Sequence, residues 1–563
     1  MTRSTNQRRL YNIAAAVLLL LAAIGLVGDM RSAHPFDDAY MFVRYAMNIR
    51  HGLGVSWNLN GVHTYGQTSL LWCGVVLVLS YLPMGMAKML VFASTVSAVG
   101  ALVAIAWSVA ANAKSELMSS GWRVLPWIAV PLAGTAIFKG NAYNGMETML
   151  GALLCGLFVG MGLKWQRGEV RPELLGLVGV LLFLTRPESA LVVVLFPLLV
   201  FALMPGPGWA SLLRLYGVFL AGAALDLLMC KLYFHTALPL SFYMKSWHPY
   251  KGYMWSGVWH PEIVLASFLE ACELYLMALF FLVRREDWRM VTCCVVPATA
   301  VFIYLQTVMQ IMGLNARYYI AYLAFLLVPA LLVIDRWLAA GEAARENVAE
   351  EMDTARRWPG NTLWIRSGMA VALVLFFFAL TFPGVAKGIR RVENETHYGY
   401  ESANLVTVAT AELPQKPWDT MNEQVTDLLM AKLPRGATVT GSEVGYLGAR
   451  AAQVNIIDLA GLNDAQIALQ GFHMSALLAR KPDVIWMPEF SYTYQRGEMF
   501  SDPAFYQQYD VYAGAANYGL AIRKDSPFHA QIKLQMQAFW NAMYPGYTMS
   551  EYLVHSASWT GAE

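Results

Sequence analysis

The sequence predicts a mostly α-helical membrane protein, built as a polytopic helical bundle followed by a C-terminal soluble α/β domain. Of the 563 residues, 57% are hydrophobic types and 14% are charged, whereas soluble domains carry roughly 25% charged residues. Apolar runs long enough to cross a bilayer recur until about residue 386. The remainder has the composition of a soluble domain, with short β-branched runs between amphipathic ones.

The net charge and the spacing of the cysteines argue against a nucleic-acid-binding protein and against a cysteine-based metal or disulfide site. The net charge is +2, which gives no reason to expect a nucleic acid partner. The six cysteines all lie in apolar runs and show no CxxC or CxxH spacing. We therefore expect small core residues and not a metal or disulfide set. They are Cys73, Cys155, Cys230, Cys272, Cys293 and Cys294.

The apolar runs predict about eleven transmembrane helices. The first run follows a charged start and lacks an Ala-x-Ala cleavage pattern, so we interpret it as an uncleaved span. The fifth run is short and requires tilting or protein cover. The expected ranges are about 10–29, 88–111, 122–139, 146–163, 172–185, 188–204, 211–233, 262–283, 289–311, 317–338 and 366–386.

Basic clusters orient these spans. The positive-inside rule places the clusters in the cytoplasm, which puts the N-terminus inside and the C-terminal domain outside. If the run from Thr68 to Leu82 crossed the membrane, every later loop would lie on the opposite side. It has about 15 residues before Pro83, so we expect a helix packed along the outer interface. The alternative is an even number of spans with this run crossing.

Two domains follow from this organisation. Residues 1–388 form the membrane module, with a first outer loop at 30–87, and residues 389–563 form the outer α/β domain. The charged segment from Ala340 to Arg357 is expected to be a cytoplasmic helix. The outer domain has strand patterns in "ATVTGSEVGYL", "VNIIDLAGL", "PDVIWMP" and "NYGLAIRK", and helix patterns in "DTMNEQVTDLLMAKL" and "DAQIALQGFHMSALLARK".

The adjacent acids Asp37 and Asp38 follow the first span directly. One of them can simply cap the helix that begins near Ala39. An acidic pair at a membrane interface is otherwise costly, because like charges repel and apolar surroundings disfavour ionisation. The same surroundings raise a carboxylate pKa and make a useful general base. Asp37 and Asp38 are therefore the candidate catalytic residues.

The rest of the first outer loop suits a sugar. Arg44 follows the acids on the same helix face, and the glycine-rich segments "GLGVSWN" and "HTYGQTS" carry Trp57, His63 and Tyr65. Aromatic faces stack on sugar rings, and polar groups bind sugar hydroxyls. We expect these four residues to contact the sugar or the acceptor, although His63 is equally compatible with a surface position.

Two further segments place charges between apolar runs. "NAYNGMETML" puts Glu147 at the start of a span, where the helix dipole alone favours it. "FLTRPES" holds Arg186 and Glu188 on either side of a proline. An intramolecular ion pair is the simplest interpretation, but charges at membrane depth are functional candidates.

Cations on the outer face oppose the positive-inside trend. Lys245 lies in "LPLSFYMKSWHPYKGY" with Tyr243 and His248, and Arg317 begins "ARYYI" together with Tyr318. Arginine binds phosphate through two nitrogens and lysine as a point charge. A phosphate held at this surface accounts for these cations, and lipid headgroups are the alternative partner. Tyr243 and His248 are candidate contacts to the sugar or the acceptor.

These features together describe a substrate with a lipid tail in the bundle, a phosphate at the interface and a sugar outside. At this point the sequence resembles the GT-C superfamily of integral-membrane glycosyltransferases. It is most similar to the terminal arabinofuranosyltransferases of the mycobacterial cell wall. The motifs that carry the resemblance, in chain order, are "DDAYMFVRYA", "YNGMET", "LTRPES", "LPLSFYMKSW", "ARYYI" and "IIDLAGLND".

The resemblance implies an inverting transfer from a decaprenyl- or undecaprenyl-phosphate sugar to a cell-envelope glycan or glycoconjugate. It also implies a multi-pass protein of the bacterial cytoplasmic (inner) membrane, with the C-terminal domain on the periplasmic or extracytoplasmic side. One of Asp37 and Asp38 would deprotonate the acceptor hydroxyl, and Lys245, Arg317, Tyr318 and Arg186 would hold the phosphate. Inversion needs one base and no carboxylate nucleophile. Some superfamily members use a divalent metal near the acids, so a metal beside Asp37 and Asp38 stays open.

Several alternatives remain at this stage. The outer domain is shorter than in mycobacterial enzymes, so a transferase of a hexose to lipopolysaccharide or pilin is an alternative to arabinofuranose transfer. Outside enzymes, a lipid-linked glycan transporter or a sugar-binding scaffold is possible. The one-sided clustering of polar residues and the absence of repeats favour an enzyme. In the outer domain, Asp458, Asn463 and Asp464 lie in strand-end turns, which is their default role over acceptor binding.

Overall fold

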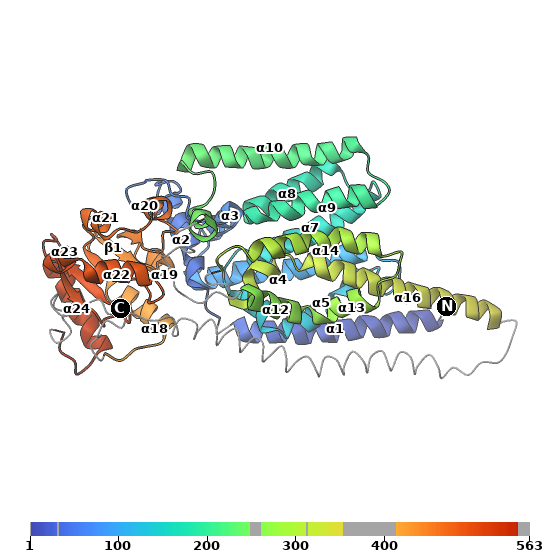
Figure 1. The fold of residues 1–563 in the computed structure, drawn as a ribbon. Helices are drawn as coiled ribbons and strands as arrows, with labels where there is room; N and C mark the ends of the chain where they lie inside the picture. Colours follow the sequence, from blue (N-terminus) through green and yellow to red (C-terminus); the bar gives the residue numbers. More distant parts are fainter. Residues whose placement is uncertain (1, 31–32, 248–260, 311–313, 353–412, 550–563) are drawn as a thin grey trace.

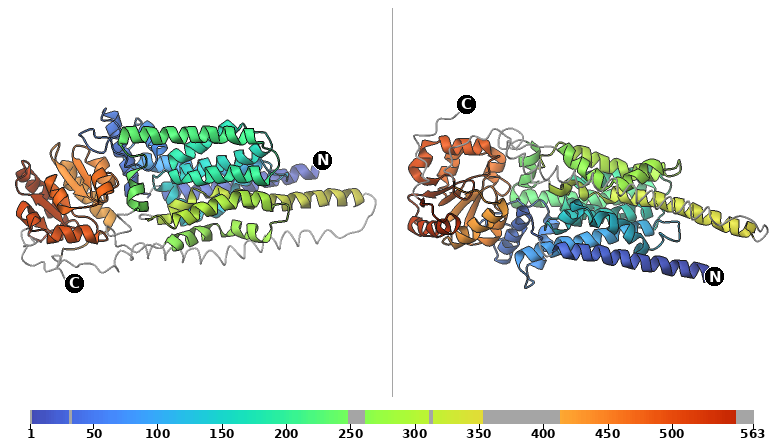
Figure 2. Two further views of the ribbon diagram at one scale, coloured as in Figure 1. Left: turned by 45° about the horizontal axis from the view of Figure 1, so that its top comes forward. Right: turned by 90° about the horizontal axis from the view of Figure 1, so that it is seen from below.

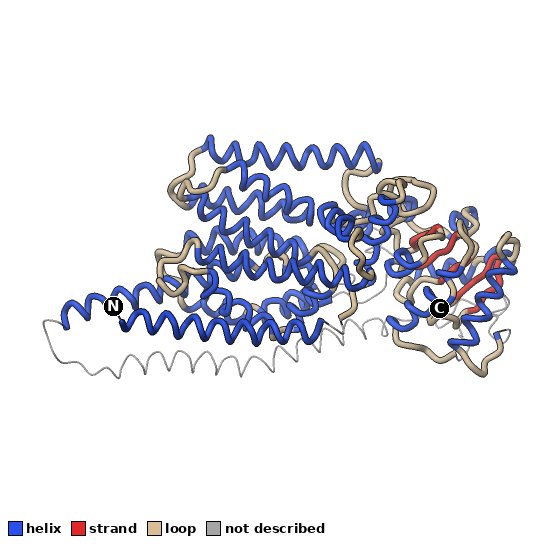
Figure 3. The backbone as a smooth tube through the Cα atoms, turned by 180° about the vertical axis from the view of Figure 1, so that it is seen from behind, coloured by secondary structure: helices blue, strands red, loops and turns tan. Residues whose placement is uncertain are grey.

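The computed structural model describes residues 2–30, 33–247, 261–310, 314–352 and 413–549. It consists of an elongated bundle of helices and a tail domain, residues 413–549, at one end of the bundle (Figure 1). All strands of the described part lie in the tail domain (Figure 3). The expected fold class, a helical membrane bundle with a C-terminal α/β domain, is confirmed.

The helices of the bundle follow the apolar runs. Up to the middle of the chain they are α1 (Thr2–Met30), α4 (Met86–Ala110), α5 (Gly121–Ala133), α6 (Ala136–Tyr143), α7 (Thr148–Gln166), α8 (Pro172–Thr185), η1 (Pro187–Ser189), α9 (Ala190–Leu203) and α10 (Trp209–Phe234). After two short elements, α11 (Leu240–Phe242) and η2 (Tyr243–Trp247), come α12 (Pro261–Ala271), α13 (Glu273–Phe281), α14 (Trp288–Leu305), η4 (Leu314–Ala316), α15 (Arg317–Ile320) and α16 (Ala324–Met352).

Fewer of these helices reach the length of a membrane span than the sequence predicts. In the described residues, five are long and apolar enough to cross, and seven are if the bent pairs α5–α6 and α12–α13 each count as one span. The pairs bend by 96° and 75°. Helices α8 and α9 are apolar but shorter. The expected span at 366–386 lies outside the described residues, and the charged segment that begins at Ala340 is helical as far as Met352. The protein is a multi-pass membrane protein.

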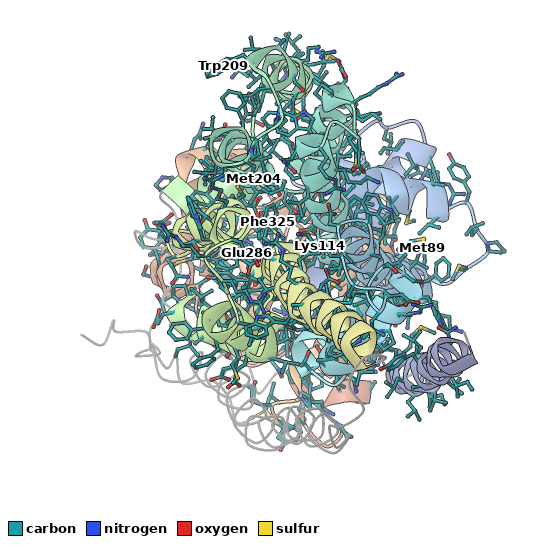
Figure 4. All side chains as sticks on the ribbon, turned by 90° about the vertical axis from the view of Figure 1, so that its right-hand side faces the viewer. Met89, Lys114, Met204, Trp209, Glu286 and Phe325 are labelled. Atoms are coloured by element: carbon teal, nitrogen blue, oxygen red, sulfur yellow. The ribbon has the colours of Figure 1, made fainter. Side chains whose placement is uncertain are left out.

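Side-chain burial fits a bundle with a packed interior and an apolar exterior. Viewed along the bundle, Phe325 lies among the helices and Trp209 lies at the periphery (Figure 4). Phe325 is fully buried, whereas Trp209 is 67% exposed. Many aliphatic residues of α1 and α10 are also exposed, as expected for surfaces that face lipid. Helix α16 continues beyond the other helices at the end opposite the tail domain (Figure 2).

Two helices of the first loop lie between the bundle and the tail domain. They are α2 (Asp37–Arg50) and α3 (Leu70–Leu79) (Figure 1). Ser69 caps α3 by accepting a hydrogen bond from the Trp72 backbone N–H at 3.1 Å. With ten residues, α3 is too short to cross a bilayer. The expectation that the run from Thr68 to Leu82 forms a packed helix that does not cross is consistent with this structure.

The tail domain contains a mixed five-stranded sheet in the order β2-β1-β3-β5-β4. Strands β1 (Thr438–Gly441), β2 (Asn455–Asp458) and β3 (Val484–Trp486) are parallel, and β5 (Leu520–Arg523) pairs antiparallel with β3 and β4 (Tyr509–Tyr512). The helices are α18 (Trp418–Leu428), η5 (Met430–Lys432), α19 (Gly445–Arg450), α20 (Ala465–Gln470), α21 (Met474–Ala479), α22 (Thr493–Ser501), α23 (Pro503–Gln508) and α24 (His529–Met543).

The first loop and the tail domain share one hydrophobic core. Apolar side chains of α2 and α3, such as Tyr45 and Trp72, pack in the same buried cluster as the sheet residues. Polar contacts reinforce this junction at the edge strand β2. The Asn58 amide donates to the Ile456 carbonyl at 3.0 Å and accepts from the Ile456 N–H at 2.7 Å. The Leu59 N–H donates to the Asn455 side chain at 3.1 Å.

The close approach of α2 and α19 depends on a glycine. A Cβ atom at Gly445 would lie 1.8 Å from the Asp37 carbonyl oxygen, a contact that forces the two helices apart. We expect Gly445→Ala to lower the free energy of unfolding by about 2 kcal/mol or more, as overpacking does. Thermal unfolding and limited proteolysis of the purified protein measure the effect.

The matched control is Gly497→Ala on α22. A Cβ atom there meets no atom within 4 Å, and alanine favours helix over glycine by up to about 1 kcal/mol. This control should unfold at the wild-type temperature or above. An equal loss of stability in both variants would contradict the tight α2–α19 contact.

Candidate active site

The two acids of the first loop lie in the first turn of α2. Phe36 precedes the helix in an extended conformation, and its N–H donates to the Asn144 carbonyl at 3.0 Å. Carboxylates are favoured in a first helical turn by the helix dipole. Both acids are therefore compatible with the local fold, but their side chains point to different parts of the protein.

Asp37 binds the tail domain. Its carboxylate accepts the backbone N–H groups of Gly445 at 2.7 Å and Tyr446 at 2.9 Å, and the Asn422 amide at 2.9 Å. Burial raises the pKa of Asp37 to about 6, although the two backbone N–H groups oppose this. With three donors from the tail domain, Asp37 joins the two parts of the protein and has little capacity left to bind a substrate.

Asp38 faces the opposite way and pairs with Arg317. The Arg317 Nη2 atom lies 2.9 Å from Asp38 Oδ2, and both side chains are mostly buried. Burial acts to raise the pKa of Asp38, but the charges of Arg317 and Lys245 outweigh burial and the pKa is lowered. The structure thus separates the predicted pair into a carboxylate that binds the tail domain and a carboxylate that lies beside cations.

Arg317 is held by unusual backbone geometry. The two residues before it, Asn315 and Ala316, have φ values of 55° and 53°, a left-handed conformation that is rare for residues with a Cβ. The Asn141 amide donates to the Asn315 carbonyl at 2.7 Å and holds this turn. Strained backbone of this kind is found preferentially at functional sites.

Three cations surround the ring of Tyr318. The Tyr318 hydroxyl lies 3.4 Å from Lys245 Nζ and 3.3 Å from Arg317 Nη2. The guanidinium carbons of Arg186 and Arg317 lie 5.1 Å and 5.2 Å from the ring centroid. The predicted phosphate-binding residues therefore meet at one place, although they come from three separate segments of the chain.

Glu147 and Glu188 supply negative charge to this group. Arg186 lies 3.1 Å from Glu147 Oε1 and 2.6 Å from Glu188 Oε1. Within the described residues, the buried Arg317 Nη1 and Glu147 Oε2 atoms have no hydrogen-bond partner. A buried polar atom without a partner costs free energy, so this group has unused capacity to bind a polar ligand.

Glu443 of the tail domain is a carboxylate near the two acids that the sequence analysis did not single out. It lies between β1 and α19, two residues before the Gly445 that binds Asp37. Its side chain is partly exposed and forms no hydrogen bond or ion pair within the described residues. Burial, followed by the charges of Asp37, Glu489 and Asp38, raises the pKa of Glu443 well above its ordinary value. No sequence signal marks it, because a single glutamate between a strand and a helix matches no motif.

The cations Lys245, Arg186 and Arg317, with Tyr318, Asp38, Glu147, Glu188 and Glu443, are called the charged cluster below. Other predicted residues lie elsewhere. Arg44 is buried and donates to the carbonyls of Trp57 at 2.6 Å, Gly448 at 2.9 Å, Ala451 at 3.3 Å and Val454 at 2.8 Å. Its guanidinium and the fully buried Trp57 therefore belong to the junction with the tail domain, and the expected contact with a sugar is not supported for either.

Of the four remaining predicted residues, two pack against helix α10, one lies in η2 and one lies outside the described residues. His63 stacks on Tyr233 with ring centroids 3.8 Å apart, and Tyr65 stacks on Phe234 at 4.8 Å. Tyr243 lies in η2 with Lys245. His248 lies outside the described residues.

The turn residues of the tail domain have structural partners. Asp458 accepts both the backbone N–H and the side-chain amide of Asn463, at 2.8 and 2.9 Å, and burial raises its pKa to about 7. Asp464 caps α20 and pairs with Arg480 at 2.6 Å. The turn role expected as the default for Asp458, Asn463 and Asp464 fits this structure better than acceptor binding.

A metal site was left open by the sequence. In the described part of the chain, no three His, Cys, Asp or Glu side chains are grouped so that they could hold a metal ion. Asp37 is occupied by N–H donors and Asp38 by Arg317. The residues present therefore do not form a recognisable metal-binding set, and no step is derived through a metal.

Comparisons with known proteins give few matches. A domain family described as a domain of unknown function (DUF8728) matches residues 411–544, which correspond to the tail domain. No curated protein matches the chain. Similar solved structures include two of ArnT from Cupriavidus metallidurans.

The ArnT structure bound to undecaprenyl phosphate has 13% sequence identity and a TM-score of 0.48, and the match covers 91% of this chain and 98% of that chain. The apo structure has 14% identity and a TM-score of 0.47, with coverage of 92% and 98%. Values this low assign no activity to this chain.

The junction around Arg44 provides a test of the structure. We expect Arg44→Met to lower the free energy of unfolding by about 2–4 kcal/mol, because buried carbonyls lose their donors. The matched control is Arg50→Met on the same helix, where Arg50 is exposed and contacts Ser80 and Tyr81. Thermal unfolding compares the two variants. Equal stability of both would contradict a structural role for Arg44.

Proposed function

We propose that the protein is a membrane glycosyltransferase that moves a sugar from a polyprenyl-phosphate donor to a cell-envelope glycan or glycoconjugate. The observation that carries this proposal is the charged cluster at the tail end of the bundle. Arg317 binds Asp38 through one nitrogen and has no hydrogen-bond partner for its buried Nη1 among the described residues. Lys245 and the Tyr318 hydroxyl lie beside it.

A phosphate fits the cation side of this cluster. Arginine donates two parallel hydrogen bonds to phosphate oxygens, and lysine adds a point charge. The apolar helices that adjoin the cluster provide surroundings for a polyprenyl chain, as in a lipid-linked substrate. Negative charge develops on the phosphate when the bond to the sugar breaks, and fixed cations at that position stabilise the transition state.

The carboxylate side of the cluster fits the acceptor. Of the two acids predicted from the sequence, Asp38 lies beside the cations, so in this proposal Asp38 contacts the acceptor hydroxyl. A single-displacement reaction with inversion requires one base and no carboxylate nucleophile. The sugar is proposed to be arabinofuranose, by the resemblance of the sequence motifs, and the reaction is proposed to take place on the extracytoplasmic side of the inner membrane.

Mass analysis of products tests this function. Purified protein is incubated with undecaprenyl-phosphate arabinofuranose or an undecaprenyl-phosphate hexose and a cell-envelope glycan fraction. A mass gain of one pentose in the glycan supports arabinose transfer, and a gain of one hexose supports the alternative transferase. Protein that transfers neither sugar, and instead moves the lipid-linked donor across vesicle membranes, would refute the proposal in favour of a transporter.

The phosphate site is tested by a binding measurement. We expect Arg317→Gln to weaken binding of undecaprenyl phosphate by about tenfold to a hundredfold, the usual effect of losing a charged hydrogen bond. The control is Arg214→Gln, since Arg214 is an exposed residue paired with Glu173. Unchanged affinity in Arg317→Gln would remove the basis of the phosphate site.

The adjacent acids should respond differently. We expect Asp38→Asn to lower turnover by about a hundredfold or more and to retain binding of undecaprenyl phosphate, because the cations remain. Asp37→Asn should instead lower the stability of the junction between α2 and the tail domain, because an amide cannot accept all three N–H donors. Turnover, lipid binding and thermal unfolding of the two variants separate these roles.

A further inference from the structure

Gln67 is a buried polar side chain that the proposed function does not yet use. It lies in the first loop, three residues before α3, and is only 2% exposed. Among the described residues, neither its Nε2 nor its Oε1 atom has a hydrogen-bond partner. Burying an amide without hydrogen bonds costs free energy. A side chain that is kept buried at this cost is expected where a ligand supplies the missing partners.

The residues before Gln67 connect the loop to the segment that carries Lys245. The Tyr65 carbonyl accepts the Leu240 N–H at 2.8 Å. Leu240 begins α11, and Lys245 follows five residues later in η2. A Cβ atom at Gly66 would lie 2.1 Å from a side-chain oxygen of the tail domain. Gln67 therefore follows the point at which the loop packs between the bundle and the tail domain.

The residues after Gln67 connect the loop to the segment that carries Arg186. The Ser69 hydroxyl donates to the Leu184 carbonyl at 3.3 Å, two residues before Arg186. Gln67 is two residues from each of these attachment points, and consecutive Cα atoms are 3.8 Å apart, so its Cα lies within about 8 Å of both. Gln67 is thus held between the two chain segments that bring Lys245 and Arg186 into the charged cluster.

Glu147 and Thr148 add polar atoms of the same kind next to this loop. The Trp72 indole N–H donates to the Gly145 carbonyl at 3.0 Å, which attaches the loop to the residues just before α7. At the start of α7, the buried Glu147 Oε2 and Thr148 Oγ1 atoms have no hydrogen-bond partner in the part of the chain that the structure describes. Each sugar hydroxyl both donates and accepts hydrogen bonds, so amide, carboxylate and hydroxyl groups are suitable partners for it.

We propose that the Gln67 amide binds a hydroxyl group of the donor sugar, the sugar that is transferred. This inference rests on the proposed function. The donor sugar is bonded to the phosphate and must lie beside the cations that hold it, which is where the attachments of the loop place Gln67. The acceptor is a large glycan that reaches the site from outside, whereas Gln67 is almost fully buried. Its amide can donate through Nε2 and accept through Oε1, as a hydroxyl requires.

The first experiment measures binding and needs no turnover. Its probes are undecaprenyl phosphate and the undecaprenyl-phosphate sugar that the wild type transfers. We expect Gln67→Met to bind the lipid-linked sugar about tenfold more weakly and undecaprenyl phosphate with wild-type affinity, because only the sugar loses a hydrogen bond. Methionine is chosen because it is unbranched and of similar length. Equal weakening of both probes, or of neither, would overturn the inference.

The second experiment uses donors that each lack one sugar hydroxyl. In the wild type, the donor without the hydroxyl that Gln67 binds should lose about tenfold in kcat/KM. This loss should be absent in Gln67→Met, because the same hydrogen bond has already been removed. The KM of the acceptor should stay at the wild-type value. The inference is wrong if every deoxy donor keeps its wild-type loss in the variant, or if only the KM of the acceptor rises.

Thermal unfolding without ligand separates a ligand-binding amide from a structural one. Because the Gln67 amide loses no protein partner, Gln67→Met should unfold at the wild-type temperature or above. The matched control is Gln453→Met, since the Gln453 amide donates to three backbone carbonyls of the tail domain at 2.9–3.3 Å. This control should unfold at a lower temperature and retain the wild-type ratio of the two affinities. A Gln67→Met protein that unfolds at a lower temperature, or does not fold, would show a structural role and overturn the inference.

Failure of the inference and failure of the proposed function give different results. If the wild type transfers neither sugar, the proposed function fails and the inference fails with it. If the wild type transfers a sugar and Gln67→Met equals it in donor binding and with every deoxy donor, Gln67 does not bind the sugar and the proposed function stands.

Discussion

The hydrogen bonds that the Asp37 carboxylate accepts from the tail domain are the contact on which the candidate active site depends. Through Gly445, Tyr446 and Asn422, this carboxylate fixes α19 and α18 against α2. The residue after Asp37 then points toward Arg317. A single buried carboxylate thus fixes the helix that places Asp38 beside the cations of the bundle.

The charged cluster combines groups whose environments differ strongly within a short distance. Cations surround Asp38 and Tyr318, whereas carboxylates surround Glu443. Titratable groups whose pKa values are moved in opposite directions are a frequent arrangement at acid–base sites. The cluster therefore has cations on the side of the bundle and carboxylates on the side of the tail domain.

Much of the bundle could be predicted from the sequence, because an apolar run that is long enough to cross a bilayer predicts a helix. Runs such as 172–185 coincide with the bounds of α8. The sequence did not reveal the bends at α5–α6 and α12–α13, which depend on packing. In the tail domain, β1, β2, β3 and β5 fall within predicted strands, but β4 was missed. Its four residues, "YDVY", include an aspartate and follow a helix directly.

The candidate site could be predicted only in part. Lys245 and Arg317 were recognisable because, in the predicted topology, they oppose the charge bias of membrane loops, and the structure places both beside the Tyr318 hydroxyl. The roles of Asp37 and Arg44 were not recognisable, because their partners lie about 400 residues away in sequence. Glu443 was missed because a lone glutamate after a strand carries no local pattern.

The side chain of Asn58 has a consequence beyond the geometry of the junction. By donating to and accepting from Ile456, it occupies backbone groups on an outer strand of the tail sheet, as a neighbouring strand would. Unpaired backbone on such a strand recruits strands from other molecules and leads to aggregation. The first loop, which carries Asn58, therefore also prevents β-pairing between molecules. A tail domain separated from this loop would be prone to self-association.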